Sequence, residues 1–169
     1  LRNELIKRSV ITTAEVLTRP IRGRQQTHLM TGYVHKPYAP IYAMLARHGG
    51  FDSALLVRGV EGGVTASLRQ ASTTYQFIGE QPEVAVEVDP ESLGIQHDLR
   101  APAIPVGVEG NEEISKRAAE AGIKALEGRE GITFDTLLLS ATLVLHHLGR
   151  CETLEQGAEL VRDVLKSGG

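Results

Sequence analysis

The segment Ser53–Leu68, with the sequence SALLVRGVEGGVTASL, constrains the fold more than any other part of this chain. Its first half, Ala54–Val57, is short and continuously apolar, which is typical of a strand buried on both faces of a sheet. The apolar run stops at Arg58, and three glycines follow within five residues. Because small-molecule sites in α/β sheets lie beyond the C-terminal ends of the strands, this loop is the first candidate site.

The glycine loop, residues 58–65, offers few side chains and much backbone. Glycine takes positive φ and lets a ligand approach the main chain closely. The charged side chains at the turn are Arg58 and Glu61. The candidate binding residues are Arg58, Gly59, Glu61, Gly62 and Gly63. A loop that only connects two elements explains the glycine spacing equally well, so spacing alone leaves both interpretations open.

Hydrophobic periodicity and turn residues predict an α/β chain. The elements expected in the first half are a helix at 3–18, a strand at 27–34, a helix at 38–48, a strand at 53–57, and a hairpin from 72–78 and 84–88. A strand, helix and strand in succession indicate a right-handed parallel crossover. An irregular stretch then leads to three helices at 111–127, 134–148 and 153–167. We expect Asn111 to cap the first of these and the second, apolar nearly all round, to be buried.

Charge is distributed unevenly along the chain. Residues 1–50 contain eight Lys or Arg against two Asp or Glu, whereas the whole chain has a net charge of −3. Candidate contacts to nucleic-acid phosphates are Lys7, Arg19, Arg22, Arg24 and Lys36. An ordinary solvated surface is the alternative. Because the chain has no Trp and few aromatic residues, base stacking is not expected to be the main source of affinity for single-stranded nucleic acid.

Two phrases point to a known family. VRGVEGG in the glycine loop, followed after a hairpin by VDPESLGI, resembles anthranilate phosphoribosyltransferase and its homologues. That family has a His-Gly-x-Asp-Gly-Leu-Asp-Glu loop after an apolar strand, and a later Pro-Glu-x-x-Gly-Leu phrase that Glu91, Leu93 and Gly94 fit. The likeness continues through GNEEISKRAAEAGIKALEGREG, DTLLLSATLVLHHLG and ETLEQGAELVRDVLKSG, so it covers nearly the whole chain.

The resemblance implies a fold and an activity. The fold is the C-terminal part of a nucleoside phosphorylase/phosphoribosyltransferase-type α/β fold, a mixed sheet with a parallel crossover, a hairpin and three C-terminal helices. Residues 1–169 would form the C-terminal portion of the large α/β domain, without the family's N-terminal helical domain and its Gly-Thr-Gly-Gly-Asp phosphate loop. The implied reaction transfers a pentosyl group from a diphosphate-activated sugar to a nitrogen acceptor. The implied partners are the missing N-terminal half, a second copy in a homodimer, and a small phosphorylated sugar.

Departures from the family pattern are as informative as the matches. Family enzymes hold Mg²⁺ with the Asp-Glu pair of the loop, and here Val64 and Thr65 stand at those positions. Any Mg²⁺ would then have to arrive with a diphosphate substrate. Arg58 replaces the family's His, and Glu61 replaces an Asp. A loop of this kind resembles that of a divergent, anthranilate phosphoribosyltransferase-like branch of the family, and some members of this branch are described as nucleic-acid binders. The alternative is therefore that the chain belongs to a catalytically inactive homologue that binds nucleic acid non-specifically through a basic surface.

A further candidate follows from the same resemblance. In the family enzymes an Arg near the start of the matching segment pairs with the anthranilate carboxylate, and Arg8 is the corresponding residue here. A surface arginine near a helix start is the plainer interpretation of Arg8.

The remaining features indicate an ordinary cytoplasmic protein. The single cysteine, Cys151, has no disulfide partner within the chain, and the sequence places no catalytic His or Asp around it. His146 and His147 are adjacent on a helix and therefore point to different faces, which favours a structural pair over a metal site. No apolar run reaches the ~18 residues that a membrane span requires.

Overall fold

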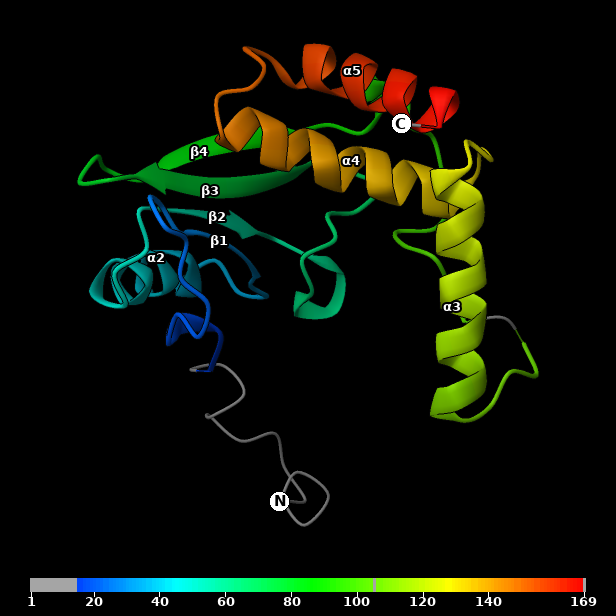
Figure 1. Ribbon diagram of the computed structural model, residues 1–169, viewed down its shortest axis with the longest axis horizontal. Coiled ribbons are helices and arrows are strands. Elements are labelled where there is room, and N and C mark those ends of the chain that lie inside the picture. The colour runs from blue at the N-terminus through cyan, green and yellow to red at the C-terminus, as the bar shows by residue number, and fades with distance from the viewer. Residues whose placement is uncertain (1–14, 105, 169) are drawn as a thin grey trace.

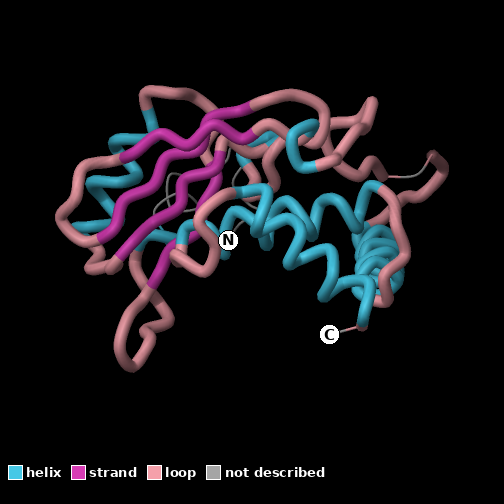
Figure 2. The backbone as a smooth tube through the Cα atoms, turned by 90° about the horizontal axis from the view of Figure 1, so that it is seen from above, coloured by secondary structure: helices cyan, strands magenta, loops and turns pink. Residues whose placement is uncertain are grey.

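The computed structural model describes residues 15–104 and 106–168. Its sheet has four strands in the order β1 (His28–Gly32), β2 (Ser53–Val57), β3 (Ser72–Ile78) and β4 (Val84–Val88). β1 and β2 are parallel, whereas β2 with β3 and β3 with β4 are antiparallel. Figure 2 shows the strands side by side in one twisted sheet. The predicted mixed sheet with a parallel crossover and a hairpin is therefore confirmed.

Helices cover both faces of this sheet (Figure 1). They are α2 (Tyr38–His48), α3 (Asn111–Leu126), α4 (Ile132–His147) and α5 (Leu154–Ser167), with short 3₁₀ turns at η1 (Glu15–Leu17), η2 (Val60–Gly62) and η3 (Glu91–Leu93). α2 packs on one face, and α4 and α5 pack on the other. α3 runs across the direction of α4 and reaches beyond the sheet (Figure 1). None of the helices in the described ranges is long and apolar enough to cross a membrane.

β2 is the most buried strand because both of its faces are covered. All five of its residues are buried. Successive side chains of a strand point to opposite faces. Ala54 and Leu56 accordingly pack with the small residues of α2, whereas Leu55 and Val57 pack with α4 and α5. The apolar run is therefore continuous because both faces of β2 are covered, as the sequence predicts.

Three details differ from the expectation. Most of the helix expected at 3–18 lies outside the described residues, and its described end, Glu15–Leu17, is a 3₁₀ turn. The strand expected at 27–34 spans only His28–Gly32. The N-cap of α3 is Gly110, and Asn111 is already the first helical residue. Gly110 takes a φ of 85°, a conformation that disfavours side-chain-bearing residues, and turns the chain into the helix.

Candidate functional site

The parallel pair β1 and β2 brings two chain segments to one edge of the sheet. Gly32 and Val57, the last residues of these strands, are register partners. The Tyr33 amide donates a hydrogen bond to the Val57 carbonyl at 2.9 Å, which holds the strand ends together as the chain leaves the sheet. The glycine loop therefore begins directly beside the segment that follows β1, at the C-terminal edge where ligands of α/β sheets bind.

The glycine loop is tightly folded on itself. The amides of Gly59, Gly62 and Gly63 donate hydrogen bonds to the carbonyls of Val57, Gly59 and Val60 at 2.9, 3.2 and 3.0 Å, in that order. Glu61 has φ 53° and ψ 26°, in the left-handed region that residues other than glycine rarely adopt. Because the three glycine amides already have acceptors, cradling a phosphate with them would require these bonds to open.

Close backbone contact explains two of the glycines. A Cβ atom added to Gly59 would lie 1.5 Å from the Gly63 carbonyl oxygen, and one added to Gly32 would lie 2.1 Å from the same oxygen. The loop is thus seated on the end of β1 with no room for a side chain. Gly59 belongs to the glycine-rich pattern of the sequence, whereas Gly32 stands alone in a strand and gives no such signal.

One cleft, here called the charged cleft, opens on one side of the glycine loop. It has a volume of about 650 Å³ and lies between the loop and the segment 98–104. A hydrogen bond of 3.0 Å from the Leu68 amide to the Arg100 carbonyl joins its two walls. Its charged lining residues are Glu61, Arg69, Asp98 and Arg100. Arg69 and Arg100 were not expected from the sequence, because the two residues come together only through this loop contact.

A second cleft, here called the aromatic cleft, opens on the other side of the loop. Its volume is about 470 Å³, and its described lining includes Tyr33, His35, Tyr38 and Tyr42 but no carboxylate, Lys or Arg. The Tyr33 hydroxyl donates a hydrogen bond to the Thr73 carbonyl at 3.0 Å. Burial, and after it the neighbouring Tyr75, raises the pKa of Tyr33, and the nearby positive charge of Arg58 opposes this rise only in part. Arg58 therefore stands close to the aromatic cleft.

The predicted binding residues lie in different parts of the structure and differ in exposure and in partners. Arg58 and Glu61 are exposed at the glycine loop. Arg8 and Lys7 lie outside the described residues. The Arg19 guanidinium donates a hydrogen bond to the Gly50 carbonyl, so this arginine helps to hold the chain beyond the end of α2. Arg22, Arg24 and Lys36 are exposed.

The positions that match the family's metal ligands hold no carboxylate. Val64 is 44% exposed and lines the aromatic cleft, while Thr65 lines the charged cleft. Across the ranges 15–104 and 106–168, no three His, Cys, Asp or Glu side chains are grouped so that they could hold a metal ion. A single hydroxyl and an aliphatic side chain do not form the oxygen-rich set that Mg²⁺ prefers, so these residues do not fit the ion.

Of the two histidines of α4, His147 is a buried, hydrogen-bonded structural residue. His147 is 4% exposed, with its Nε2 atom 2.7 Å from Ser53 Oγ and its Nδ1 atom 3.0 Å from Gln76 Oε1. His28 Nδ1 lies 2.7 Å from the same Ser53 oxygen. This network, the histidine–serine network, ties α4 to β1, β2 and β3 at the edge opposite the glycine loop. Cys151 is a free cysteine, and burial raises the pKa of its thiol, which disfavours a reactive thiolate.

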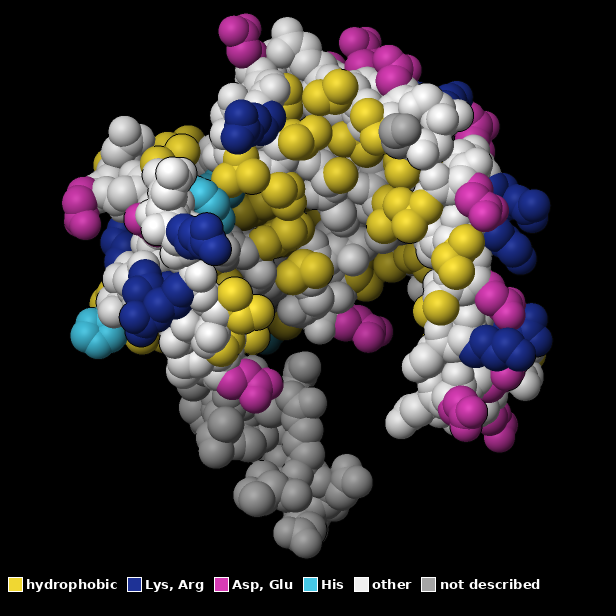
Figure 3. All heavy atoms as spheres, viewed as in Figure 1, with side chains coloured by type: hydrophobic (Ala, Val, Ile, Leu, Met, Phe, Trp, Pro, Cys, Tyr) yellow, Lys and Arg dark blue, Asp and Glu magenta, His cyan; other side chains and the backbone are white. Residues whose placement is uncertain are grey.

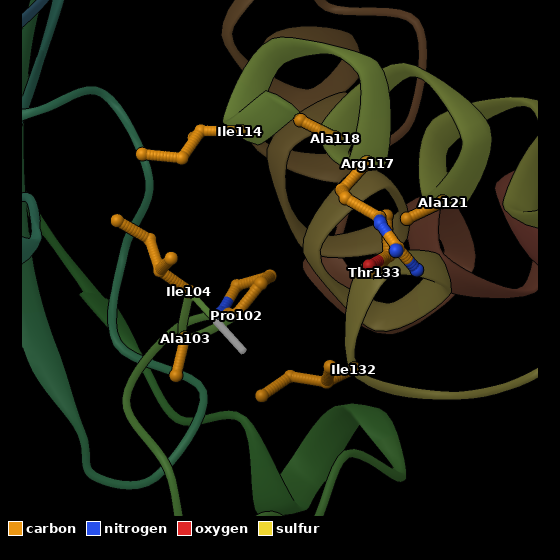
Figure 4. Close-up of a pocket in the computed structure, with 9 residues that line it drawn as sticks. All are labelled: Pro102, Ala103, Ile104, Ile114, Arg117, Ala118, Ala121, Ile132 and Thr133. Atoms are coloured by element: carbon orange, nitrogen blue, oxygen red, sulfur yellow. The ribbon is translucent and has the colours of Figure 1, made fainter. Parts of the chain in front are cut away.

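An apolar groove continues from the charged cleft along α3. Its volume is about 320 Å³, and its lining is mostly aliphatic. Figure 4 shows Ile114, Ala118 and Ala121 along α3, with Pro102 and Ile104 facing them from the loop. The loop residues Pro102, Ala103 and Ile104 line both cavities. The glycine loop, the charged cleft and this groove therefore form one connected surface.

Comparison with known proteins places this geometry in a family. A family model described as "Glycosyl transferase family, a/b domain" matches residues 2–169. The chain is 30% identical over 158 residues to an uncharacterized protein of Aquifex aeolicus, and the match covers 93% of this chain. It is 27% identical over 172 residues to anthranilate phosphoribosyltransferase of Bacillus cereus, with 99% of this chain covered. In each case the match covers 46% of the relative, so the chain spans about half the length of these proteins.

Solved structures show the same fold. Anthranilate phosphoribosyltransferase of Saccharomyces cerevisiae, a Ser121Ala variant with Mg bound, superposes with a TM-score of 0.64 at 19% identity, covering 84% of this chain and 39% of that one. The enzyme of Thermus thermophilus gives a TM-score of 0.54 at 23% identity, covering 81% and 38%. The chain therefore belongs to the glycosyl transferase family as its a/b domain, and it resembles the C-terminal part of anthranilate phosphoribosyltransferase.

Proposed function

We propose that this chain is the α/β part of a glycosyltransferase that moves a pentosyl group from a diphosphate-activated sugar to a nitrogen acceptor. Family membership supports the reaction class. The observation that carries the proposal is the glycine loop at the C-terminal end of buried β2, with exposed Arg58 and a cleft on each side. The charged cleft suits the phosphorylated donor, and the aromatic cleft suits a planar acceptor.

The proposed chemistry needs positioning and charge stabilisation. The bond from the anomeric carbon to the diphosphate oxygen breaks, and its electron pair leaves with the diphosphate. A new bond forms from the acceptor nitrogen to that carbon, and the nitrogen loses its proton to solvent. Fixed positive groups beside the leaving diphosphate lower the barrier because they stabilise charge that grows in the transition state. Arg58, exposed on the glycine loop that both clefts share, supplies one such group in this proposal.

The rest of the site comes from other parts of the protein in this proposal. Relatives are about twice as long as the matched region. In the described sheet β1 is an edge strand, and α4 leaves Leu137, Ala141 and Leu145 only partly buried. Figure 3 shows apolar side chains gathered over the middle of the face that α4 crosses in Figure 1. We infer that residues 1–169 form the C-terminal portion of the large α/β domain, completed by an N-terminal half that carries the phosphate loop.

The Arg58→Ala variant tests the donor site. We expect its affinity for phosphoribosyl diphosphate to fall about tenfold or more, because a hydrogen bond to a charged group is worth about 2 kcal/mol. Isothermal titration calorimetry of the full-length protein measures the change. Arg150→Ala is the matched control, since Arg150 is also an exposed arginine but follows α4 rather than β2 and the glycine loop. Equal affinity of both variants and the unaltered protein would remove Arg58 from the site.

Nucleic-acid binding is the second candidate function. The observation in its favour is that Arg22, Arg24 and Lys36 are exposed, and none of their side chains has a partner within the described part of the chain. Such cations are free to contact phosphate oxygens, and contacts of this kind carry no sequence preference. This surface lies on the segments before α2, apart from the charged cleft.

A salt titration distinguishes this function from the first. With a labelled oligonucleotide, fluorescence anisotropy would give salt-sensitive binding that phosphoribosyl diphosphate does not displace. Replacing Arg22, Arg24 and Lys36 together with Gln would reduce the slope of log K against log salt by roughly one for each lost contact. A matched variant replaces Lys116, Lys124 and Arg150, which are exposed elsewhere. Binding that is absent at low salt, or equal slopes for both variants, would reject the second function.

A further inference from the structure

Two arginines line the charged cleft from segments that are far apart in the sequence. Arg69 follows the glycine loop, and Arg100 follows the turn η3. The hydrogen bond from the Leu68 amide to the Arg100 carbonyl holds the two backbones beside each other, and both arginines line the same cavity. Both residues are exposed, and neither side chain has a hydrogen bond or ion pair within residues 15–104 and 106–168. The two cations are therefore available to a ligand.

The lining of the charged cleft also includes the position that corresponds to one of the family's metal ligands. Thr65, at the position of the family's Glu, lines this cleft together with Arg69 and Arg100. Where a carboxylate and Mg²⁺ would bridge a diphosphate, this chain has a neutral hydroxyl and two guanidinium groups. Guanidinium presents paired N–H donors that match phosphate oxygens, and its charge is permanent. The cleft can thus neutralise a diphosphate with side chains alone.

We propose that Arg69 and Arg100 bind the diphosphate of the sugar substrate directly and replace the metal ion that family enzymes use at this place. That the ligand is a sugar diphosphate rests on the proposed function. That two arginines bind a diphosphate directly, without a metal ion, does not. Arg69 and Arg100 act as a pair of donors from opposite walls of the cleft. Because neither charge depends on a metal, chelators leave the binding unchanged.

The alternative is that the diphosphate binds through a metal ion held by the two carboxylates of the same cleft. Glu61 and Asp98 also line it, and neither forms an ion pair in the described part of the chain. One or two carboxylates together with substrate phosphates are a common way to hold Mg²⁺. The two modes predict opposite effects. Removing a carboxylate strengthens direct binding by arginines, whereas it abolishes binding through a metal.

Titration with inorganic diphosphate tests the proposal on the full-length protein. We expect saturable binding in EDTA, with affinity lowered about tenfold in Arg69→Gln and about tenfold in Arg100→Gln, as loss of one charge-assisted contact predicts. The combined Glu61→Gln and Asp98→Asn variant should bind at least as tightly as the unaltered protein. Arg150→Gln is the control for a general change in charge, and circular dichroism confirms that each variant is folded.

Two results would overturn the proposal. One is binding that requires Mg²⁺ and disappears in the carboxylate variant. The other is equal affinity of Arg69→Gln, Arg100→Gln and the control. A separate assay for diphosphate release with nitrogen acceptors keeps this test apart from the proposed function. Binding in EDTA without any transfer would support the arginine site and reject the transferase. Transfer that is insensitive to both arginine variants would support the transferase and reject the arginine site.

Discussion

Replacing Gly59 with alanine is expected to destabilise the protein by about 3 kcal/mol, the upper end of what steric overpacking costs. The added Cβ would lie 1.5 Å from the Gly63 carbonyl oxygen, and the obstructing atom is backbone, which cannot move aside as a flexible side chain does. The loop would have to leave the end of β1. Chemical denaturation measures the free energy of unfolding, and the same variant should lose affinity for phosphorylated ligands.

Gly122→Ala is the matched control for this substitution. Gly122 lies inside α3, and a Cβ there would meet no atom within 4 Å. Alanine is a better helix former than glycine, so this variant should gain up to about 1 kcal/mol. If Gly59→Ala were as stable as the unaltered protein, the tight packing of the glycine loop described here would be wrong.

Acidification is expected to remove up to about 3 kcal/mol of stability through His147 alone. Burial, together with the charges of His28 and His146, lowers the pKa of His147 from 6.5 to about 4. The unfolded chain therefore binds a proton near pH 6.5 that the folded chain refuses until about pH 4. Between these values the unfolded state holds more protons, so stability falls as the pH is lowered through this interval and is fully present above it.

Urea denaturation between pH 8 and pH 4 measures this effect. In His147→Gln, the part of the pH dependence due to His147 should disappear, although the variant is itself less stable because Ser53 and Gln76 lose a buried partner. His48→Gln is the control, since His48 is exposed at the end of α2. A His147→Gln variant with the same pH dependence as the unaltered protein would contradict the structural role of the histidine–serine network.

Elements with a strong local signal could be predicted from the sequence. The run Ala54–Val57 is apolar because both faces of β2 are covered, and that pattern exists before any folding. The hairpin and α4 were also recognisable, the hairpin from alternation around Gly79–Pro82 and α4 from its apolar surface. The preference of Asn for N-cap positions predicts Asn111 as the cap of α3, and this prediction is wrong because the chain uses the positive φ of Gly110.

The site was predictable only where its residues are neighbours in the sequence. Arg58 and Glu61 share one loop, so their association needed no tertiary information. Arg69 and Arg100 meet through a contact between two irregular segments, and Gly32 matters because a distant carbonyl lies against it. The sequence makes Arg19 a candidate for phosphate contacts, and in the structure its guanidinium donates a hydrogen bond to the Gly50 carbonyl, a partner that no local pattern reveals.

The most direct test of the account is titration of the full-length protein with phosphoribosyl diphosphate, monitored by calorimetry with and without EDTA. The proposed donor site predicts saturable binding of one ligand per chain, unchanged by EDTA and weakened about tenfold by Arg58→Ala. Absence of saturable binding under both conditions would contradict a donor site at the glycine loop. Nucleic-acid binding through Arg22, Arg24 and Lys36 would then be the remaining candidate function.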